Sequence, residues 1–217
     1  MKKEIILLAA SKKHKNLCVA GIDTSTGQWI RIVSEDSTIS YAIKSEDAIY
    51  EDESLPELLD IIEIQCRGRQ SSYYQAENYI NNPEYYWKNI GRAEIKEILK
   101  IHPLENEDYI FYNAENKVHK DYILALNDEK DKNSLMLIAP TNITIHVQQW
   151  ERKKVKMSFL YKGIKYRYLA VTDIDFEQRY LAMEPNDYSL TNGTVLVISL
   201  GECYNDYHSK LIATIIE

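Results

Sequence analysis

The sequence predicts a mainly β protein of the α+β class, with two small barrels or sandwiches and helices between them. Strand-like stretches fill the first third of the chain, helical spacing appears in the middle, and strand-like stretches return in the last third. The 217 residues suffice for one large domain or two small ones. With 45% hydrophobic residues, either arrangement can bury a sizeable core.

The first third contains four stretches that are typical of strands. Residues 4–10 and 17–22 are short and apolar, bounded by polar residues. Residues 29–33 and 60–66 alternate between two faces, as a strand does. Gly27 lies between the second and third stretches, where a turn needs positive φ.

Two helices are expected in the middle of the chain. Asn82 is a good N-cap and Pro83 suits a first helical position, and apolar residues then follow helical spacing. His102-Pro103 would end this helix. A second helix is expected over 116–127, where apolar residues recur at helical intervals.

The last third predicts strands again, including a hairpin that turns at Lys162-Gly163. The strands are expected at residues 134–139, 141–150, 153–161, 164–171, 194–200 and 211–216. We therefore expect a first barrel over 1–80, a helical insert over 81–130 and a second barrel over 131–217.

The charge is acidic overall but unevenly placed. The net charge is −7, which disfavours non-specific coating of nucleic acid. Residues 1–33 carry six cations against two acids, and residues 150–170 carry seven cations against one acid. Residues 34–63 carry ten acids against Lys44. Two basic segments could therefore build a binding surface, unless they are ordinary solvated faces.

No strong catalytic or targeting motif is present in the sequence. Cys18, Cys66 and Cys203 are odd in number and far apart, so neither a disulfide framework nor a zinc site is indicated. Histidine and serine patterns of zinc or nucleophilic enzymes are missing. No secretory signal or transmembrane stretch is visible. We expect a cytoplasmic protein with no catalytic residues, metal, cofactor or membrane association.

Two clusters of residues suggest contacts with nucleic acid. Trp29 and Arg31 share a strand face near a basic loop, where an aromatic ring can stack a base and a guanidinium can pair with a phosphate. They could equally be a core tryptophan and an arginine that neutralises a buried carboxylate. Tyr74 can also stack, and Gln75 and Asn78 can read base edges. Those amides could instead cap strand ends.

The motifs as a set resemble the dual-OB-containing domain family of bacteria. They are Ala10-Ser11-Lys12-Lys13, Cys18 to Asp23, Gly27 to Arg31, Tyr74 to Asn78, Phe159-x-Tyr161-x-Gly163-x-x-Tyr166, Val171-Thr172-Asp173, Ser199 to Glu202 and Lys210 to Ala213. The resemblance spans almost the whole chain in order. Ile32, Ile174 and Cys203 stand where proline is common in the family.

The resemblance implies two OB-like barrels and a nucleic-acid-binding or sensing role, often beside defence or mobile-element functions. The leading hypothesis is a non-catalytic module that binds single-stranded or structured nucleic acid. Phosphates would meet Lys12, Lys13, Arg31, Lys153 and Lys154, bases would stack on Trp29 and Tyr74, and base edges would meet Gln75 and Asn78.

Three alternatives stay open at this point. A nucleotide or modified base could bind where the two barrels meet, in a pocket built from Arg31, Gln75, Glu77, Asn78, Thr172, Asp173, Ser199 and Glu202. A metal-dependent nuclease could use Asp173, Asp175 and Glu202, although acids at this spacing usually cap turns. A protein-interaction adaptor could dock a basic partner through the acidic segment 35–63.

Overall fold

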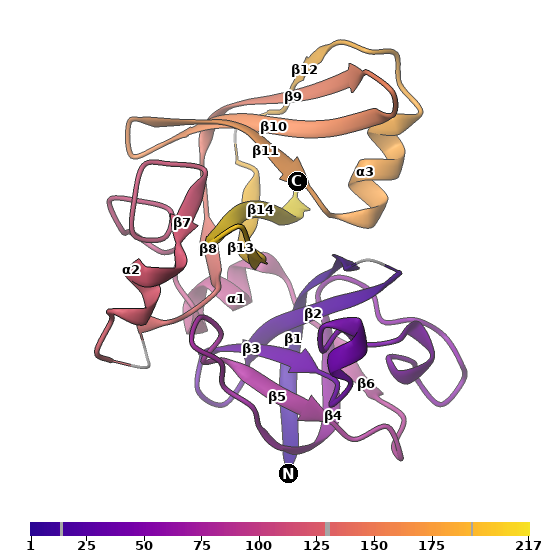
Figure 1. Ribbon diagram of the computed structural model, residues 1–217. Helices are drawn as coiled ribbons and strands as arrows, with labels where there is room; N and C mark the ends of the chain where they lie inside the picture. The colour runs from indigo at the N-terminus through magenta and orange to yellow at the C-terminus, as the bar shows by residue number, and fades with distance from the viewer. Residues whose placement is uncertain (14, 129–130, 192) are drawn as a thin grey trace. The chain divides into compact units, whose positions relative to one another are not determined.

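The computed structural model describes the chain except residues 14, 129–130 and 192 and the side chains of Lys12 and Lys13. It divides into two compact units, Met1–Pro103 and Leu104–Glu217. Both are built mainly from strands (Figure 1), so the mainly β class with barrels is confirmed. No described helix is long and apolar enough to cross a membrane.

The first unit is a closed barrel of five strands. They are β1 (Lys2–Lys13), β2 (Asn16–Asp23), β3 (Trp29–Val33), β4 (Asp60–Arg69) and β5 (Asn78–Asn81). The strands follow the order β1-β2-β3-β5-β4, and β4 pairs back onto β1. The β3–β5 pair is parallel and the other four pairs are antiparallel. This Greek-key ring is an OB-type barrel.

Strand β1 closes the ring because it serves two partners. Its first half pairs with β4 and its second half with β2, with a register shift between Leu7 and Ala9. Gly21 lies directly against the Ile6 carbonyl, where a Cβ atom would have no room. Close strand approach at this bend therefore depends on glycine.

Shorter elements surround the first barrel. They are η1 (Ser37–Ile39), η2 (Ser45–Asp47), β6 (Lys88–Arg92) and α1 (Ile95–Ile101). Strand β6 pairs with the beginning of β4, and Trp87 just before β6 is buried in the barrel core.

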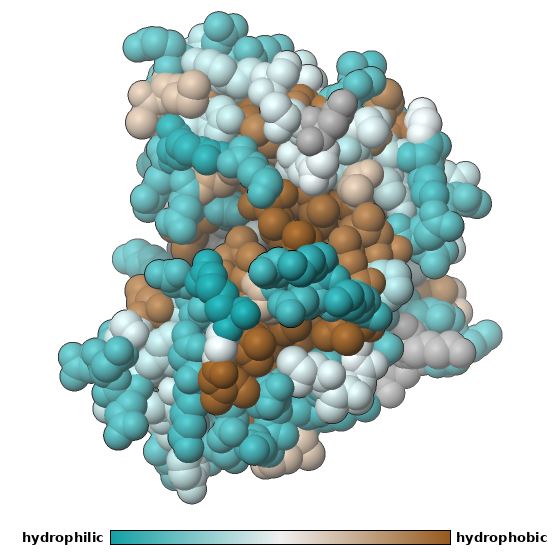
Figure 2. Space-filling model, turned by 180° about the vertical axis from the view of Figure 1, so that it is seen from behind, coloured by the Kyte–Doolittle hydropathy of each residue, from teal (hydrophilic) through white to brown (hydrophobic). Residues whose placement is uncertain are grey.

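Figure 2 shows hydrophilic residues in teal over much of the side seen there, with apolar residues gathered among them.

The second unit repeats this strand order. Its elements are β7 (Lys117–His119), α2 (Lys120–Leu124), β8 (Leu135–Ile138), β9 (Thr141–Gln149), β10 (Lys153–Tyr161), β11 (Ile164–Val171), α3 (Ile174–Leu181), β12 (Asp187–Ser189), β13 (Val195–Tyr204) and β14 (Tyr207–Ile216). The main path is β9-β10-β11-β14-β13-β8, with β11 and β14 parallel. Strands β8 and β9 are separated only by Ala139-Pro140, so together they correspond to the bent β1.

The helix expected to begin at Asn82-Pro83 is wrong. Trp87 extends the chain instead, because its N–H donates to the Ile49 carbonyl at 3.0 Å and its indole Nε1–H donates to Asn81 Oδ1 at 3.1 Å. Strand β6 follows directly. The helix begins only after Glu94, where Glu97 completes a capping box.

The expected helix over 116–127 is shorter than predicted, because Lys117–His119 pair with β14 as strand β7. The segment 81–130 thus contains strands as well as helices. The division into a first barrel over 1–80, a helical insert over 81–130 and a second barrel over 131–217 stays a prediction.

A buried lysine makes the stability of the second unit depend on pH. Lys210 is 2% exposed, and its Nζ donates to the Asn113 carbonyl at 2.7 Å and to Asn113 Oδ1 at 2.8 Å. Burial lowers the pKa of this amine from 10.5 to about 7.

Between these two pKa values the unfolded chain binds more protons at this site, so the free energy of unfolding should rise with pH. The slope should approach about 1.4 kcal/mol per pH unit. Lys210→Met should reduce this slope, when the free energy of unfolding is measured by urea denaturation at pH values between about 7 and 10.5. Equal slopes for the two proteins would contradict the assignment.

Candidate nucleic-acid interface

The second unit presents a basic and aromatic surface on strands β9 to β11. We call it the basic face and define it by Trp150, Lys154, Lys156, Lys165, Arg167 and Tyr168. Lys154 and Lys156 alternate along β10 with the buried Val155 and Met157, so they lie on the outer side of the strand. Strands β9, β10 and β11 lie side by side in Figure 1.

Exposed aromatic rings accompany these cations. Trp150 lies at the turn between β9 and β10 and is 75% exposed, and Tyr168 on β11 is 48% exposed. Tyr204 and Tyr207 are exposed at the turn between β13 and β14. OB-type barrels bind oligonucleotides across their second and third strands and the loops between strands 1 and 2 and between strands 4 and 5. The basic face and these two turns occupy those positions in the second unit.

Lys153 and Lys154 have different environments although they are neighbours. Lys153 Nζ donates to the carbonyls of Leu181, at 2.9 Å, and Met183, so it satisfies the C-terminal end of α3. Lys154 is exposed. The predicted phosphate contact therefore fits Lys154 better than Lys153.

In the first unit, four of the residues singled out from the sequence form a buried polar cluster around Arg31. Arg31 is 3% exposed, and its Nε lies 3.4 Å from Glu77 Oε1. Burial disfavours the charged guanidinium, but the neighbouring Cys18 and Glu77 raise its pKa above the usual value. Arg31 thus meets a carboxylate of its own chain where a phosphate was predicted.

The amides that follow Tyr74 join this cluster. Asn78 lies beside Arg31 in the parallel β3–β5 pair, and its Nδ2 donates to Gln75 Oε1 at 3.2 Å. The structure therefore brings together four predicted residues, Arg31, Gln75, Glu77 and Asn78. Tyr74 is half-buried, with its ring 5.1 Å from that of Tyr73.

The remaining predicted contacts of the first unit are Trp29, Lys12 and Lys13. Trp29 is buried and packs edge-to-face on His102, with ring centroids 5.2 Å apart. It offers no open face for a base, as the core alternative expected. Lys12 and Lys13 end strand β1, and their side chains lie outside the described part of the structure.

The acids considered for a nuclease are placed differently from one another. Asp173 caps α3, because Oδ1 accepts the Phe176 N–H and Oδ2 accepts the Ile215 N–H, each at 3.0 Å. Burial raises the pKa of this carboxyl. Asp175 and Glu202 are exposed. Among the residues that the structure describes, no three His, Cys, Asp or Glu side chains are grouped to hold a metal.

The other two residues of the predicted pocket are Thr172 and Ser199. Thr172 Oγ1 donates to the Ile212 carbonyl at 3.1 Å. Ser199 is buried on β13, in register with Leu135 of β8.

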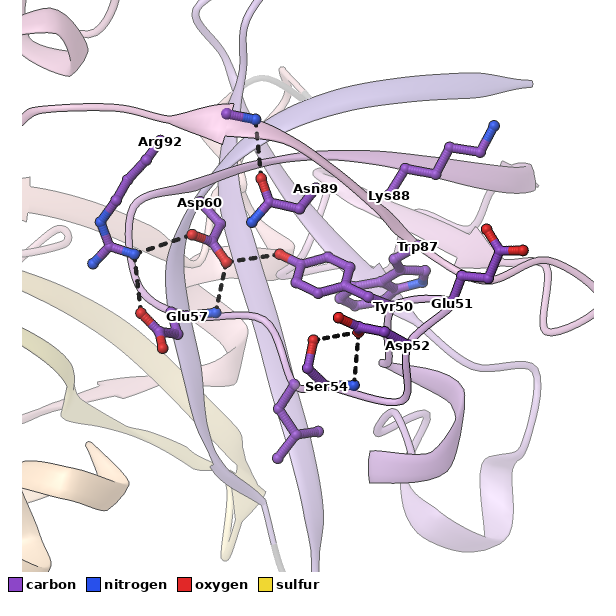
Figure 3. A pocket seen from close by; sticks show the side chains of 12 residues that line it. Tyr50, Glu51, Asp52, Ser54, Glu57, Asp60, Trp87, Lys88, Asn89 and Arg92 are labelled. Carbon is purple, nitrogen blue, oxygen red and sulfur yellow. Dashed lines mark hydrogen bonds and ion pairs between the residues drawn. The ribbon is translucent and has the colours of Figure 1, made fainter.

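A separate pocket of about 870 Å³ in the first unit is lined by residues of the acidic segment and by residues of and next to β6 (Figure 3). Asp60 organises its polar wall, accepting from Tyr50 Oη at 2.8 Å, the Glu57 N–H at 2.9 Å and Arg92 Nη1 at 3.1 Å. Burial and the bond to Asp60 raise the pKa of Tyr50. This wall is an internal hydrogen-bond network.

Comparison with known proteins agrees with the strand order of both units. The family model described as the dual OB-containing domain matches residues 3–215. The chain belongs to this family. Searches of curated proteins and of solved structures give no match.

In this dual OB-containing domain, sequence reasoning missed most of the basic face. No sequence motif singles out Trp150 or Tyr168, and the cations Lys156, Lys165 and Arg167 enter only through the net charge of residues 150–170. The net charge of residues 150–170 was the available signal, because it combines seven cations with a tryptophan at the hairpin turn. Which of these side chains share a face depends on a register shift that the sequence did not reveal.

The buried pair in the first barrel should contribute strongly to stability. Arg31→Met or Glu77→Leu alone leaves an uncompensated buried charge, and should lower the free energy of unfolding by about 3–5 kcal/mol. The double variant should recover much of that loss. Urea denaturation measures each.

The matched control is Glu35→Ala. It breaks an exposed pair in which Glu35 Oε2 lies 2.6 Å from Arg67 Nη1, and should cost no more than about 1 kcal/mol. If single variants at Arg31 and Glu77 are as mild as this control, the pair is not an important buried contact.

Proposed function

We propose that the protein binds single-stranded or structured nucleic acid across the basic face of its second barrel. The observation that carries this proposal is the exposed Trp150 at the β9–β10 turn, beside the cations of the basic face. Aromatic rings stack bases and the surrounding cations attract the phosphate backbone.

The uneven charge supports a confined binding surface. The whole chain carries −7, whereas residues 150–170 carry seven of its 26 cations and one acid. A strand of nucleic acid would therefore be attracted to this face and repelled by acidic regions such as segment 34–63. Confinement of this kind favours a defined site over general coating.

The first barrel supports this role less directly. Arg31 is already paired with Glu77, and Trp29 is buried. A direct contact from Arg31 would require Glu77 in the loop between β4 and β5 to move, and one from Trp29 would require its packing on His102 to change. The exposed side chains of the second barrel need no such change.

The test is fluorescence anisotropy with labelled single-stranded DNA, single-stranded RNA and duplexes, at low and physiological salt. Trp150→Ala should weaken binding about tenfold or more, because stacking contributes roughly 1–3 kcal/mol per base. Lys165→Gln should weaken binding to all sequences and reduce the salt slope by about one.

Tyr86→Ala and Lys96→Gln are matched controls, since both side chains are exposed on the first unit. They should leave the affinity unchanged. Absence of binding by the wild-type protein at low salt, where electrostatic attraction is strongest, would overturn the proposal.

One observation favours a second candidate, a small ligand with hydrogen-bond donors in the first barrel. Asn78 is 5% exposed, and its Oδ1 is buried with no hydrogen-bond partner among the residues that the structure describes. Unsatisfied buried acceptors are rare in native proteins. Free nucleosides should then raise the melting temperature of the wild type but not of Asn78→Ala. Equal shifts in both proteins would remove this candidate.

A further inference from the structure

The backbone of Tyr168 is unusual for a residue in a strand. Its φ is +56°, in the left-handed region that a bulky side chain rarely adopts. The side chain is 48% exposed, so packing of its ring in the core does not explain this conformation. Strained residues of this kind persist where the surrounding structure holds them, and they gather at functional sites.

A chain of hydrogen bonds holds this backbone in place. The Tyr168 N–H donates to Ser158 Oγ at 3.0 Å, and Ser158 Oγ lies 2.8 Å from His146 Nε2. His146 Nδ1 lies 2.7 Å from Asp187 Oδ1. Four neighbouring strands, β9 to β12, each supply one member.

The donors and acceptors along this chain are mutually consistent. A carboxylate can only accept, so His146 Nδ1 carries the hydrogen of its bond to Asp187. With a neutral imidazole, Nε2 accepts from the Ser158 hydroxyl. The serine oxygen is then free to accept the Tyr168 N–H. The imidazole also lies against the tyrosine ring, with centroids 4.5 Å apart.

A β-bulge explains why Ser158 can reach Tyr168. Met157 pairs with Leu169 and Phe159 with Tyr166, so Ser158 faces two residues of β11. Bulges of this type redirect side chains and recur next to binding sites. Here the bulge places an exposed ring among Lys156, Lys165 and Arg167.

We propose that Asp187, His146 and Ser158 position Tyr168 as a rigid platform for one unpaired base, so that the basic face selects single-stranded over duplex nucleic acid. This inference rests on the proposed function. A flat ring stacks the face of a base only when that base is not enclosed in a duplex. The cations around it would bind the backbone on either side.

The same three side chains have the hydrogen-bond order of a nucleophilic serine site. Ser158 is buried, however, and its oxygen already accepts the Tyr168 N–H. Asp187 is largely exposed. We therefore assign Asp187, His146 and Ser158 as positioning residues.

The experiment compares oligothymidylate of roughly 16 nucleotides, the upper site size of an OB fold, with a duplex of the same length by anisotropy. Tyr168→Leu should lose about tenfold or more in single-strand affinity and keep its duplex affinity. Tyr168→Phe keeps the ring and should bind as the wild type does. Tyr109→Leu changes an exposed tyrosine outside the basic face and is the control.

The positioning role is tested by Ser158→Ala, which should reproduce the selective loss of Tyr168→Leu, and by Ser158→Thr, which retains the hydroxyl and should not. Tyr168→Gly removes the ring but suits positive φ. It should lose single-strand affinity without loss of folding stability, and it decides the role of the ring if Tyr168→Leu does not fold.

The outcomes separate the two proposals. If the wild type binds neither probe at low salt, the proposed function fails. If it binds both probes equally, or if Tyr168→Leu and Tyr168→Gly keep wild-type single-strand affinity, nucleic-acid binding stands and the platform is overturned. If the Tyr168 variants lose affinity but Ser158→Ala does not, the positioning role fails.

Discussion

Each unit depends on one bent strand that pairs with two partners. In the first barrel β1 pairs with β4 and then with β2. In the second unit β8 pairs with β13 and β9 pairs with β10, with Ala139-Pro140 between β8 and β9. Proline lacks an N–H, so it suits a corner where ladder pairing changes from one neighbour to another. The bend directs one side of each strand inward and leaves the other side available for contacts.

The two units use that outer side differently. In the first, Arg31 and Asn78 on the outer side of β3 and β5 are covered and engaged with residues of the loop before β5. In the second, strands β10 and β11, which correspond to β2 and β3, keep Lys154, Lys165 and Tyr168 exposed. On these outer positions, Arg31 and Asn78 of the first barrel are therefore paired internally, while Lys154, Lys165 and Tyr168 of the second are open to solvent. Burial, and not residue type alone, distinguishes a stabilising arginine from a binding one.

The sequence predicted the fold class well because alternating and apolar stretches report burial locally. It failed at 82–92, where helix-capping residues suggested a helix but the buried Trp87 required an extended chain. Of the residues that it singled out, Lys154 lies on the basic face, and Arg31 lies in the buried polar cluster of the first barrel. It could not locate Tyr168 or the Asp187–His146–Ser158 chain, because their meeting depends on strand order and on a bulge.

The placement of the closing pairs has a consequence for synthesis of the chain. The parallel β3–β5 pair joins residues far apart in sequence, a contact that forms slowly because a long loop must close first. Yet every strand of the first barrel lies before Leu104, and the second ring begins only at β8. All strands of the first barrel are therefore synthesised before those of the second. They can pair while the ribosome is still making the second barrel, which shortens the time for which their unpaired edges are exposed.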